Sequence, residues 1–420
     1  MAAPVRKMKF SPAVVGPVLL GSLILLGGLL ALGPWRSVLQ TARRPARVLF
    51  DAGLSPVHED LPAGWSNDQC GSCHQGEYEQ WKRSRHYTSA TNENFRIECL
   101  DPEGGRLQFC INCHAPMNPG HDKFPTSEPA QLDSWFQQEP DWLTQGVDCI
   151  TCHVRDGTVL ATNVSDKGRV AHPMRLAPEL ARADFCSGCH QFSFKTSQLP
   201  DSFFGDLQQA SMEEFLEFRQ HSGLDLHCQD CHMPDGDHLM PGGYHLSMLQ
   251  QAVDMDLAAA WSEQPGLLQI TVDLTASEVG HRVPGGEHFR FLELETNVLD
   301  ADGKTVVLPV PGPPRSLDNH NDNLDSDPRR LERLPHIERM QRNLNDKGRG
   351  HRALPDDRLR PEETRTFKYL VQVPQSIPTK SLTVHALVRY HLMSDDKARL
   401  FGHDFDDVTT VIREATVEPK

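Results

Sequence analysis

Cys70-Gly-Ser-Cys73-His74 is the first of five Cys-x-x-Cys-His motifs, and these motifs decide how the chain folds. The pattern is typical of covalent c-type haem attachment, in which both thiols bind the porphyrin as thioethers and the histidine ligates the iron. The sequence therefore predicts five haems, ten cysteine attachment points and five proximal histidine ligands. The other four motifs are Cys110-Ile-Asn-Cys113-His114, Cys149-Ile-Thr-Cys152-His153, Cys186-Ser-Gly-Cys189-His190 and Cys228-Gln-Asp-Cys231-His232.

Two other chemistries use paired cysteines. A single Cys-x-x-Cys is found in thioredoxin-like redox sites, and two in tandem form zinc ribbons. Neither explains a histidine after every pair, nor an odd number of pairs. The first cysteines stand at positions 70, 110, 149, 186 and 228, and this near-regular spacing indicates a repeated packing unit.

The composition agrees with haem binding. Ten of the eleven cysteines lie in motifs, which leaves no thiols for a disulfide framework, and we expect Cys99 to be a small buried side chain. Hydrophobic residues are 38% and aromatic residues 7% of the 420 residues, so we expect the porphyrins to supply part of the core. The net charge of -15 argues against nucleic acid as a partner and favours a basic or neutral redox partner.

The N-terminal sequence predicts a membrane anchor. A basic tail, residues 1–11, precedes an uncharged apolar stretch, residues 12–33, that is long enough to cross a bilayer core of about 30 Å. The alternative is a cleaved signal peptide, whose apolar region is usually about 7 to 15 residues long. Residues 34–65 are expected to form a linker. Because haem attachment takes place outside the cytoplasm, we expect a single-pass protein of the bacterial cytoplasmic (inner) membrane with its haem domain in the periplasm.

The run Trp81-Lys-Arg-Ser84-Arg-His86 follows the first motif. Together they resemble the multihaem cytochromes grouped around the tetrahaem cytochrome c of ammonia oxidisers, pentahaem nitrite reductase and octahaem hydroxylamine oxidoreductase. In that group such a run supplies a distal iron ligand, which the resemblance assigns to His86. If residues 75–86 are helical, His86 lies about 18 Å along the helix axis from His74, so we expect it to ligate the iron of a neighbouring haem.

Further distal ligands can be drawn from many histidines. The chain has 21, so sixteen remain after the five motif positions, and surplus histidines without an iron are expected among them. His227 is either a ligand to another haem or a surface residue, and His121 and His172 are comparable candidates. Met117 is an alternative thioether ligand. The resembled families place a histidine downstream of Cys-His-Met-Pro, which implies a distal role for His245.

The texture changes after the last motif. We predict a pentahaem domain at residues 66–248, mostly helix and loop, followed by an all-β, sandwich-like domain at residues 249–420. Alternating apolar and polar residues predict strands at 268–274, 291–298, 365–373 and 382–390. Within the charged stretch 315–358, near-helical spacing of Leu331, Leu334, Ile337 and Met340 predicts a solvated loop with one short helix, or else a docking surface for a redox partner.

Two loops of this second domain again resemble the multihaem group. Gly280-His281-Arg-Val-Pro284-Gly285-Gly286 resembles its Gly-His-x-x-Pro-Thr-Gly loop, with Gly285 where threonine is usual, and residues 357–363 resemble a strand-entry motif of its β-domains. The resemblance implies that His281 reaches back to ligate a haem, against the alternative of a structural turn histidine. Such a contact would clamp the sandwich onto the haem domain.

Two classes of function remain open. The leading hypothesis is a membrane-anchored pentahaem electron carrier between a quinol-linked membrane donor and a periplasmic acceptor, because bis-histidine ligation fills both axial positions of an iron. Anchored tetrahaem quinol dehydrogenases, which lack the sandwich, would be a variant of this class. The alternative is an oxidoreductase that acts on nitrite or hydroxylamine at a five-coordinate haem. Against it, the Cys-x-x-Cys-Lys motif of nitrite reductase is absent, and few tyrosines, Tyr87 and Tyr244 among them, could form a catalytic cross-link.

Overall fold

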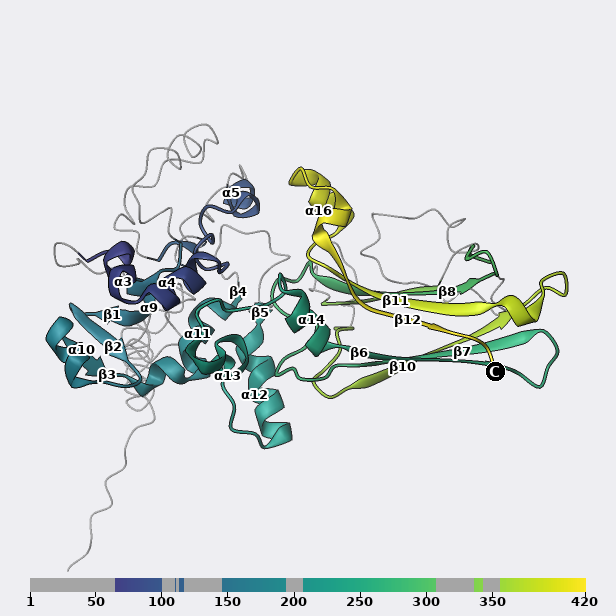
Figure 1. Ribbon diagram of the computed structural model, residues 1–420, viewed down its shortest axis with the longest axis horizontal. Helices are drawn as coiled ribbons and strands as arrows, with labels where there is room; N and C mark the ends of the chain where they lie inside the picture. The colour runs from purple at the N-terminus through teal and green to yellow at the C-terminus, as the bar shows by residue number, and fades with distance from the viewer. Residues whose placement is uncertain are drawn as a thin grey trace, which may run out of the picture.

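The computed structural model describes residues 65–99, 110, 113–116, 146–193, 207–306, 336–342 and 356–420. This part of the chain is elongated, with the motif region at one end and two stacked sheets at the other (Figure 1). The predicted tail and anchor, nearly all of the predicted linker, Met117 and His121 lie outside the described residues. None of the described helices is both long enough and apolar enough to span a bilayer.

The motif region consists of short helices and two small sheets. In one sheet β2 lies between β1 and β3, and in the other β4 pairs with β5. The helices are α3 (Asn67–Cys73), α4 (Gln75–Lys82), α5 (Glu93–Cys99), α9 (Cys149–His153), α10 (Asp166–Ala171), α11 (Ala183–His190), α12 (Ser211–Ser222), α13 (Cys228–His232) and α14 (Leu246–Ala252), with 3-10 helices η2 (Pro178–Ala181) and η4 (Pro234–Gly236). The strands are β1 (Val154–Arg155), β2 (Thr158–Ala161), β3 (Met174–Leu176), β4 (Gln191–Ser193) and β5 (Leu207–Ala210).

Side-chain caps fix where two of the motif helices begin. Ser66 accepts a hydrogen bond from the third main-chain N–H of α3 at 3.2 Å, and Asp148 caps α9 in the same way at 2.7 Å. Asn67 then joins the two helices, since its amide donates to Asp148 at 3.1 Å and accepts from the Cys149 N–H at 3.2 Å. The first and third motifs are therefore held side by side.

The second domain is a sandwich of two antiparallel sheets, with strand orders β10-β7-β6 and β12-β11-β8-β9. Hydrogen bonds between residues 259–261 and Lys420 join the two sheets along one side. The strands are β6 (Asp254–Trp261), β7 (Leu267–Thr275), β8 (Phe291–Leu299), β9 (His336–Gln341), β10 (Thr364–Gln372), β11 (Thr383–His391) and β12 (Thr409–Val417), with η6 (Thr379–Ser381), α16 (Asp395–Leu400) and η7 (Phe405–Val408) in the connections.

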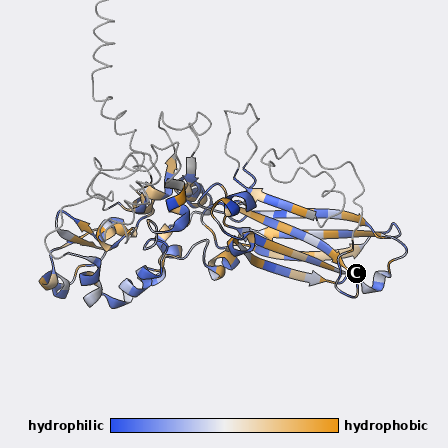
Figure 2. Ribbon diagram, turned by 90° about the horizontal axis from the view of Figure 1, so that it is seen from above, coloured by the Kyte–Doolittle hydropathy of each residue, from blue (hydrophilic) through white to orange (hydrophobic). Residues whose placement is uncertain are grey.

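The core of this sandwich follows from the period of two along each strand. On β7 the residues Leu268, Ile270, Val272 and Leu274 are at most 1% exposed, and the residues between them are Gln269, Thr271 and Asp273. Leu294 on β8 faces the same core and is fully buried. Figure 2 shows the resulting alternation of hydrophobic and hydrophilic residues along the strands.

The four predicted strands are confirmed as β7, β8, β10 and β11, with ends that differ by about one residue. The predicted helix around Ile337 and Met340 is wrong. These residues lie in β9, which pairs with β8, and Met340 is 1% exposed in the sandwich core. Strand β6 was not predicted from the sequence. Its exposed positions include Ala258 and Ala260, so apolar and polar residues do not alternate along its second half.

The motif region buries few large apolar side chains of its own. Trp81, Phe95, Phe215, Ile150 and Leu160 are among the largest of those described, and they do not form one continuous cluster as the sandwich residues do. A domain of this size needs more buried apolar surface than these side chains provide. This fits the expectation that porphyrins supply part of its core.

Leu294→Ala tests the sandwich core. Because the side chain is fully buried, we expect the free energy of unfolding to fall by about 2 to 5 kcal/mol, measured by urea denaturation followed through the β-sheet circular dichroism. Leu370→Ala on β10 is the control, since Leu370 is 43% exposed and should cost much less. Equal losses for the two variants would contradict the core assignment.

Candidate functional site

The motifs lie on short helices, which explains their internal spacing. Residues i, i+3 and i+4 share one face of a helix, so both cysteines and the histidine of Cys-x-x-Cys-His point to the same side. Residues His153, His190 and His232 are the last residues of α9, α11 and α13, and His74 caps the C-terminus of α3. None of the ten motif cysteines forms a disulfide, so the sulfurs remain for thioether bonds.

Three motif histidines each have a second imidazole nearby. A metal–imidazole bond of about 2.0 Å and a ring radius of about 1.2 Å would put two imidazole centroids on one metal about 6.4 Å apart. The observed separations match the distance for one iron between two rings, and the angles between ring planes differ. The pairs are His190 with His86 at 6.1 Å and 57°, His153 with His238 at 6.1 Å and 30°, and His232 with His281 at 6.2 Å and 4°.

Hydrogen bonds fix the proton on the outer nitrogen of four of these rings. In each case Nδ1 lies beside a main-chain carbonyl oxygen, which can only accept, so Nδ1 carries the proton and Nε2 keeps its lone pair for a metal. The contacts are His153 to Leu160 at 3.0 Å, His238 to Gly236 at 2.7 Å, His232 to Pro241 at 2.7 Å and His281 to Arg282 at 3.0 Å.

Burial favours the neutral form of His86 and of three motif imidazoles. Loss of solvation lowers the pKa of His86 to about 3, and it also lowers the pKa of His153, His190 and His232. The neutral imidazole is the form that ligates iron. Spacing therefore suits all three pairs to hold haem irons, and the tautomers of His153, His238, His232 and His281 agree with it.

His74 and His114 lack a second imidazole at such a distance among the described residues. The ring of His114 stacks on Phe95 at 4.2 Å, and its Nδ1 lies 2.9 Å from the carbonyl oxygen of Ser89. That contact again leaves Nε2 free to ligate. The distal ligands that the sequence offers for these two motifs include His121 and Met117, which lie outside the described residues.

The other predicted distal ligands have different surroundings. His227 accepts a hydrogen bond at Nδ1 from the Ala183 N–H at 3.3 Å, and His245 accepts one from the Gly242 N–H at 3.2 Å. An accepting Nδ1 places the proton of a neutral ring on Nε2, which does not favour ligation through that atom. His172 ends α10, and its buried Nδ1 has no hydrogen-bond partner. The ligand roles of these three residues stay predictions.

His238 was missed by sequence reasoning. It lies six positions after His232 in the same proline- and glycine-rich loop as His245, and the resemblance pointed to the later histidine. The loop is held against the first-motif segment, because the His238 N–H donates to the Gln80 side chain at 3.0 Å. This long-range contact and the carbonyl partner of its Nδ1 atom distinguish His238 from His245.

The sulfurs connect the motifs to one another. Hydrogen bonding with Cys149 lowers the pKa of Cys70 to about 7, which places the first and third motifs in contact. Thiol hydrogen bonds likewise join the fourth motif to the fifth, through Cys186 and Cys228, and to the second, through Cys189 and Cys113. These contacts form two groups, one of the first and third motifs and one of the second, fourth and fifth. The charge interactions of Cys152 with Cys186 and Cys189 place the two groups near one another.

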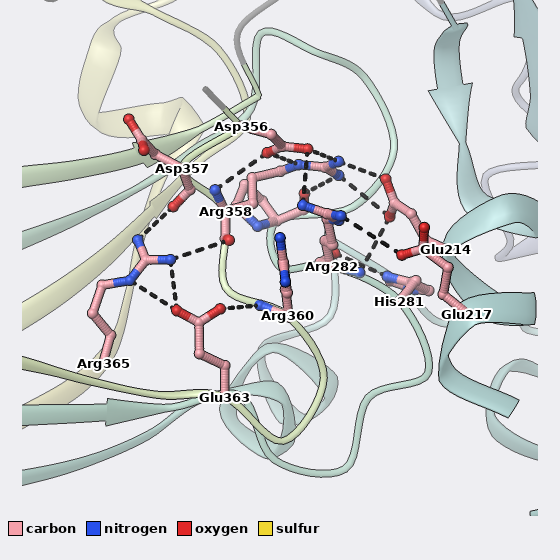
Figure 3. Close-up of polar contacts among 11 residues, drawn as sticks. Glu214, Glu217, His281, Arg282, Asp356, Asp357, Arg358, Arg360, Glu363 and Arg365 are labelled. Carbon is pink, nitrogen blue, oxygen red and sulfur yellow. Dashed lines mark hydrogen bonds and ion pairs between the residues drawn. The ribbon is translucent and has the colours of Figure 1, made fainter. Parts of the chain in front are cut away.

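A buried ion pair fastens α12 to the sandwich near His281 (Figure 3). Arg358 donates to Glu214 of α12 at 2.5 Å, and the two side chains are 3% and 8% exposed. Arg358 also pairs with Asp356 at 2.7 Å and donates to the Pro284 carbonyl at 3.2 Å. The second oxygen of Glu214 accepts from the Arg282 N–H at 3.2 Å.

This clamp fixes the loop that carries His281. Val283 and Leu359 pair through main-chain hydrogen bonds of 2.9 and 3.0 Å, so the two loops that resemble the multihaem group lie side by side. A Cβ atom on Gly285 would stand 2.7 Å from Cε1 of His281. Glycine at this position, where threonine was expected, lets the imidazole lie directly on the loop backbone.

Comparisons with known proteins agree with this arrangement. Residues 69–154 match the model of the family described as cytochrome c554 and c-prime. The crystal structure of a penta-heme cytochrome c552 from Thermochromatium tepidum is similar, with a TM-score of 0.60 and 22% sequence identity over 84% of this chain and 98% of that chain. No curated protein sequence gives a significant match.

Paired imidazoles beside Cys-x-x-Cys-His helices are an arrangement suited to haem binding. The family match over residues 69–154 and the shared fold support a multihaem c-type cytochrome, in which the ten motif cysteines would bind the c-type haems covalently. The number of motifs, five, agrees with the penta-haem structure.

His238→Ala tests the unanticipated ligand. If its imidazole completes the site of His153, its loss should convert one low-spin ferric centre to a high-spin centre in the electron paramagnetic resonance (EPR) spectrum, with haem content unchanged by intact mass. His221→Ala is the matched control and should leave the spectrum as it is, because His221 is exposed on α12 and is not a candidate ligand. A high-spin signal in the control but not in His238→Ala would reverse the assignment.

Arg358→Gln tests the clamp. Removal of one partner of a buried ion pair leaves the Glu214 charge uncompensated, so we expect stability to fall by about 3 to 5 kcal/mol. Arg219→Gln on α12, the helix that carries Glu214, is the control. Its partner Asp225 is 86% exposed, so the pair should contribute about 0 to 1 kcal/mol. Chemical denaturation measures both, and similar losses would argue against the clamp.

Proposed function

We propose that this chain is a membrane-anchored electron carrier that passes electrons from a quinol-linked donor to a periplasmic acceptor. The observation that carries the proposal is the pairing of two imidazoles at His153, His190 and His232. A c-type haem supplies reversible one-electron exchange at its iron. Two axial imidazoles leave no open coordination position, so these sites favour electron transfer over substrate binding.

The order of motif contacts suggests a route. The first motif contacts the third, the charge of Cys152 in the third reaches Cys186 in the fourth, and the fourth contacts both the second and the fifth. Cys73 and Cys231 are the exposed cysteines of the ten, which places the first and fifth motifs nearest to solvent. We assign the exchange with partners to these two motifs.

Charge supports a basic or neutral partner at the first motif. Exposed acidic residues, Asp68, Glu77 and Glu79, surround this motif, and the whole chain carries a formal charge of -15. A complementary basic surface would be steered towards it. The apolar stretch at residues 12–33 supports attachment to the cytoplasmic membrane, and haem attachment outside the cytoplasm supports a periplasmic position for the haem domain.

One observation favours an enzyme as the second candidate. Within the described residues, Phe95 rather than an imidazole is the ring beside His114. A single protein ligand at this motif would leave an iron position open to a small nitrogen compound such as nitrite or hydroxylamine. The three paired sites would then deliver electrons to it.

EPR spectroscopy of the purified ferric protein separates the two functions. For a carrier we expect five low-spin centres and no spectral change on addition of nitrite or hydroxylamine, because both axial positions of every iron are filled. A high-spin centre whose signal changes with either compound would support the enzyme instead. Intact mass should show five covalent haems in the same sample.

A further inference from the structure

Arg290 stands between the two domains without an acidic partner. It lies just before β8, at the end of the loop that begins with His281, and its Nε atom is inaccessible to solvent and has no hydrogen-bond partner. Its Nη1 atom donates to the Gly285 carbonyl at 3.4 Å, and the guanidinium also bonds to the Tyr390 hydroxyl. No described carboxylate forms an ion pair with it, and Glu287 in the same loop accepts from Gln209 at 2.5 Å.

The niche around this guanidinium is tightly built. Tyr390 of β11 is 2% exposed, and Gly286, with φ at +84°, has no Cβ atom that would otherwise stand 2.8 Å from Nη1. A Cβ on Gly243 would stand 3.1 Å from Nη1 and would overlap the Tyr390 hydroxyl. The site is therefore formed jointly by the fifth-motif loop and the sandwich.

A partly buried guanidinium without a carboxylate is electrostatically costly. Its flat, forked set of donors matches a carboxylate group better than any other common anion. Each c-type haem brings propionate carboxylates to the protein, and these need partners wherever they are removed from water. Arg290 offers that partner at the border of the haem domain.

The position of Arg290 points to one haem. The ring of His190, in the fourth motif, lies 6.1 Å from the ring of His86. Arg85, next in sequence to His86, has its guanidinium 4.1 Å from the Tyr244 ring centroid, and Arg290 stands 5.9 Å from the same centroid. Gln209 pairs with Phe192, two residues after His190, and donates to Glu287, whose carbonyl accepts from the Arg290 N–H at 3.2 Å. Arg290 is therefore linked to the segments that carry His86 and His190.

We propose that Arg290 and the Tyr390 hydroxyl bind a propionate of the haem attached at Cys186 and Cys189. The contact ties the sandwich to the haem domain through the cofactor itself. It also sets the redox equilibrium, because a nearby positive charge stabilises the added electron. Loss of the guanidinium therefore lowers the reduction potential of this haem.

An EPR-monitored redox titration of haem-loaded Arg290→Gln tests this site. The haem of His190 is recognised by its signal, because ring planes at 57° give a less rhombic low-spin spectrum than the 4° pair of His232 and His281. We expect the equilibrium constant for its reduction to fall about tenfold, which is about 59 mV for a one-electron couple. Lys304→Gln removes the same charge from the exposed turn after β8, a strand of nine residues that spans about 30 Å, and controls for net charge.

Two further variants keep the test decisive. Arg290→Lys retains the charge, so we expect a smaller decrease in the reduction potential of the His190 haem. If Arg290→Gln does not yield a haem-loaded protein, Tyr390→Phe replaces it and should also lower the reduction potential of this haem. Intact mass checks that five haems remain attached in each variant. A shift no larger than that of Lys304→Gln, or a shift confined to another haem, overturns the proposal.

Discussion

The buried ion pair between Glu214 and Arg358 is the contact on which the relation of the two domains depends. It joins α12, the longest described helix of the motif region, to the loop of the sandwich that carries Arg358. One carboxylate oxygen of Glu214 accepts from Arg358, and the other accepts from the main-chain N–H of Arg282. Two charges removed from water need this full set of partners, because a half-satisfied buried charge destabilises the fold more than an apolar contact would. The loop that carries His281 bonds to the same ion pair through the Arg282 N–H and the Pro284 carbonyl, so the position of this loop depends on the domain interface.

The sequence predicts those parts of the structure whose pattern is complete within a short stretch of residues. The Cys-x-x-Cys-His motifs are local, and they led to the haem domain and its covalent cofactors. The strands β7, β8, β10 and β11 were predicted because their alternation is complete within nine residues. Strand β9 was not, because a helix-like spacing of apolar residues competed with it and only pairing with β8 across a long connection decides the outcome.

The distal ligands show the same limit. His86 and His281 were predicted from short runs that resemble the multihaem group, and both stand beside motif histidines at a distance suited to a shared iron. Their roles, like that of His238, stay predictions. Residue type and spacing do not decide which of His238 and His245 is the distal ligand, since both follow the fifth motif in one loop rich in glycine and proline. The hydrogen bond at Nδ1 separates them, and its partner atom is a property of the folded loop.

The three histidine pairs differ in whether the partner comes before or after the motif histidine in the sequence. His86 precedes its partner His190 in sequence, whereas His153 and His232 stand beside His238 and His281, which come later. A polypeptide that emerges with its N-terminus first can thus complete the fourth-motif pair as soon as residue 190 has appeared. The third-motif pair must wait for the end of the haem domain, and the fifth must wait for the first hairpin of the sandwich. If these three pairs share irons, the last of them is completed by His281, which lies in the domain that carries no haem motif.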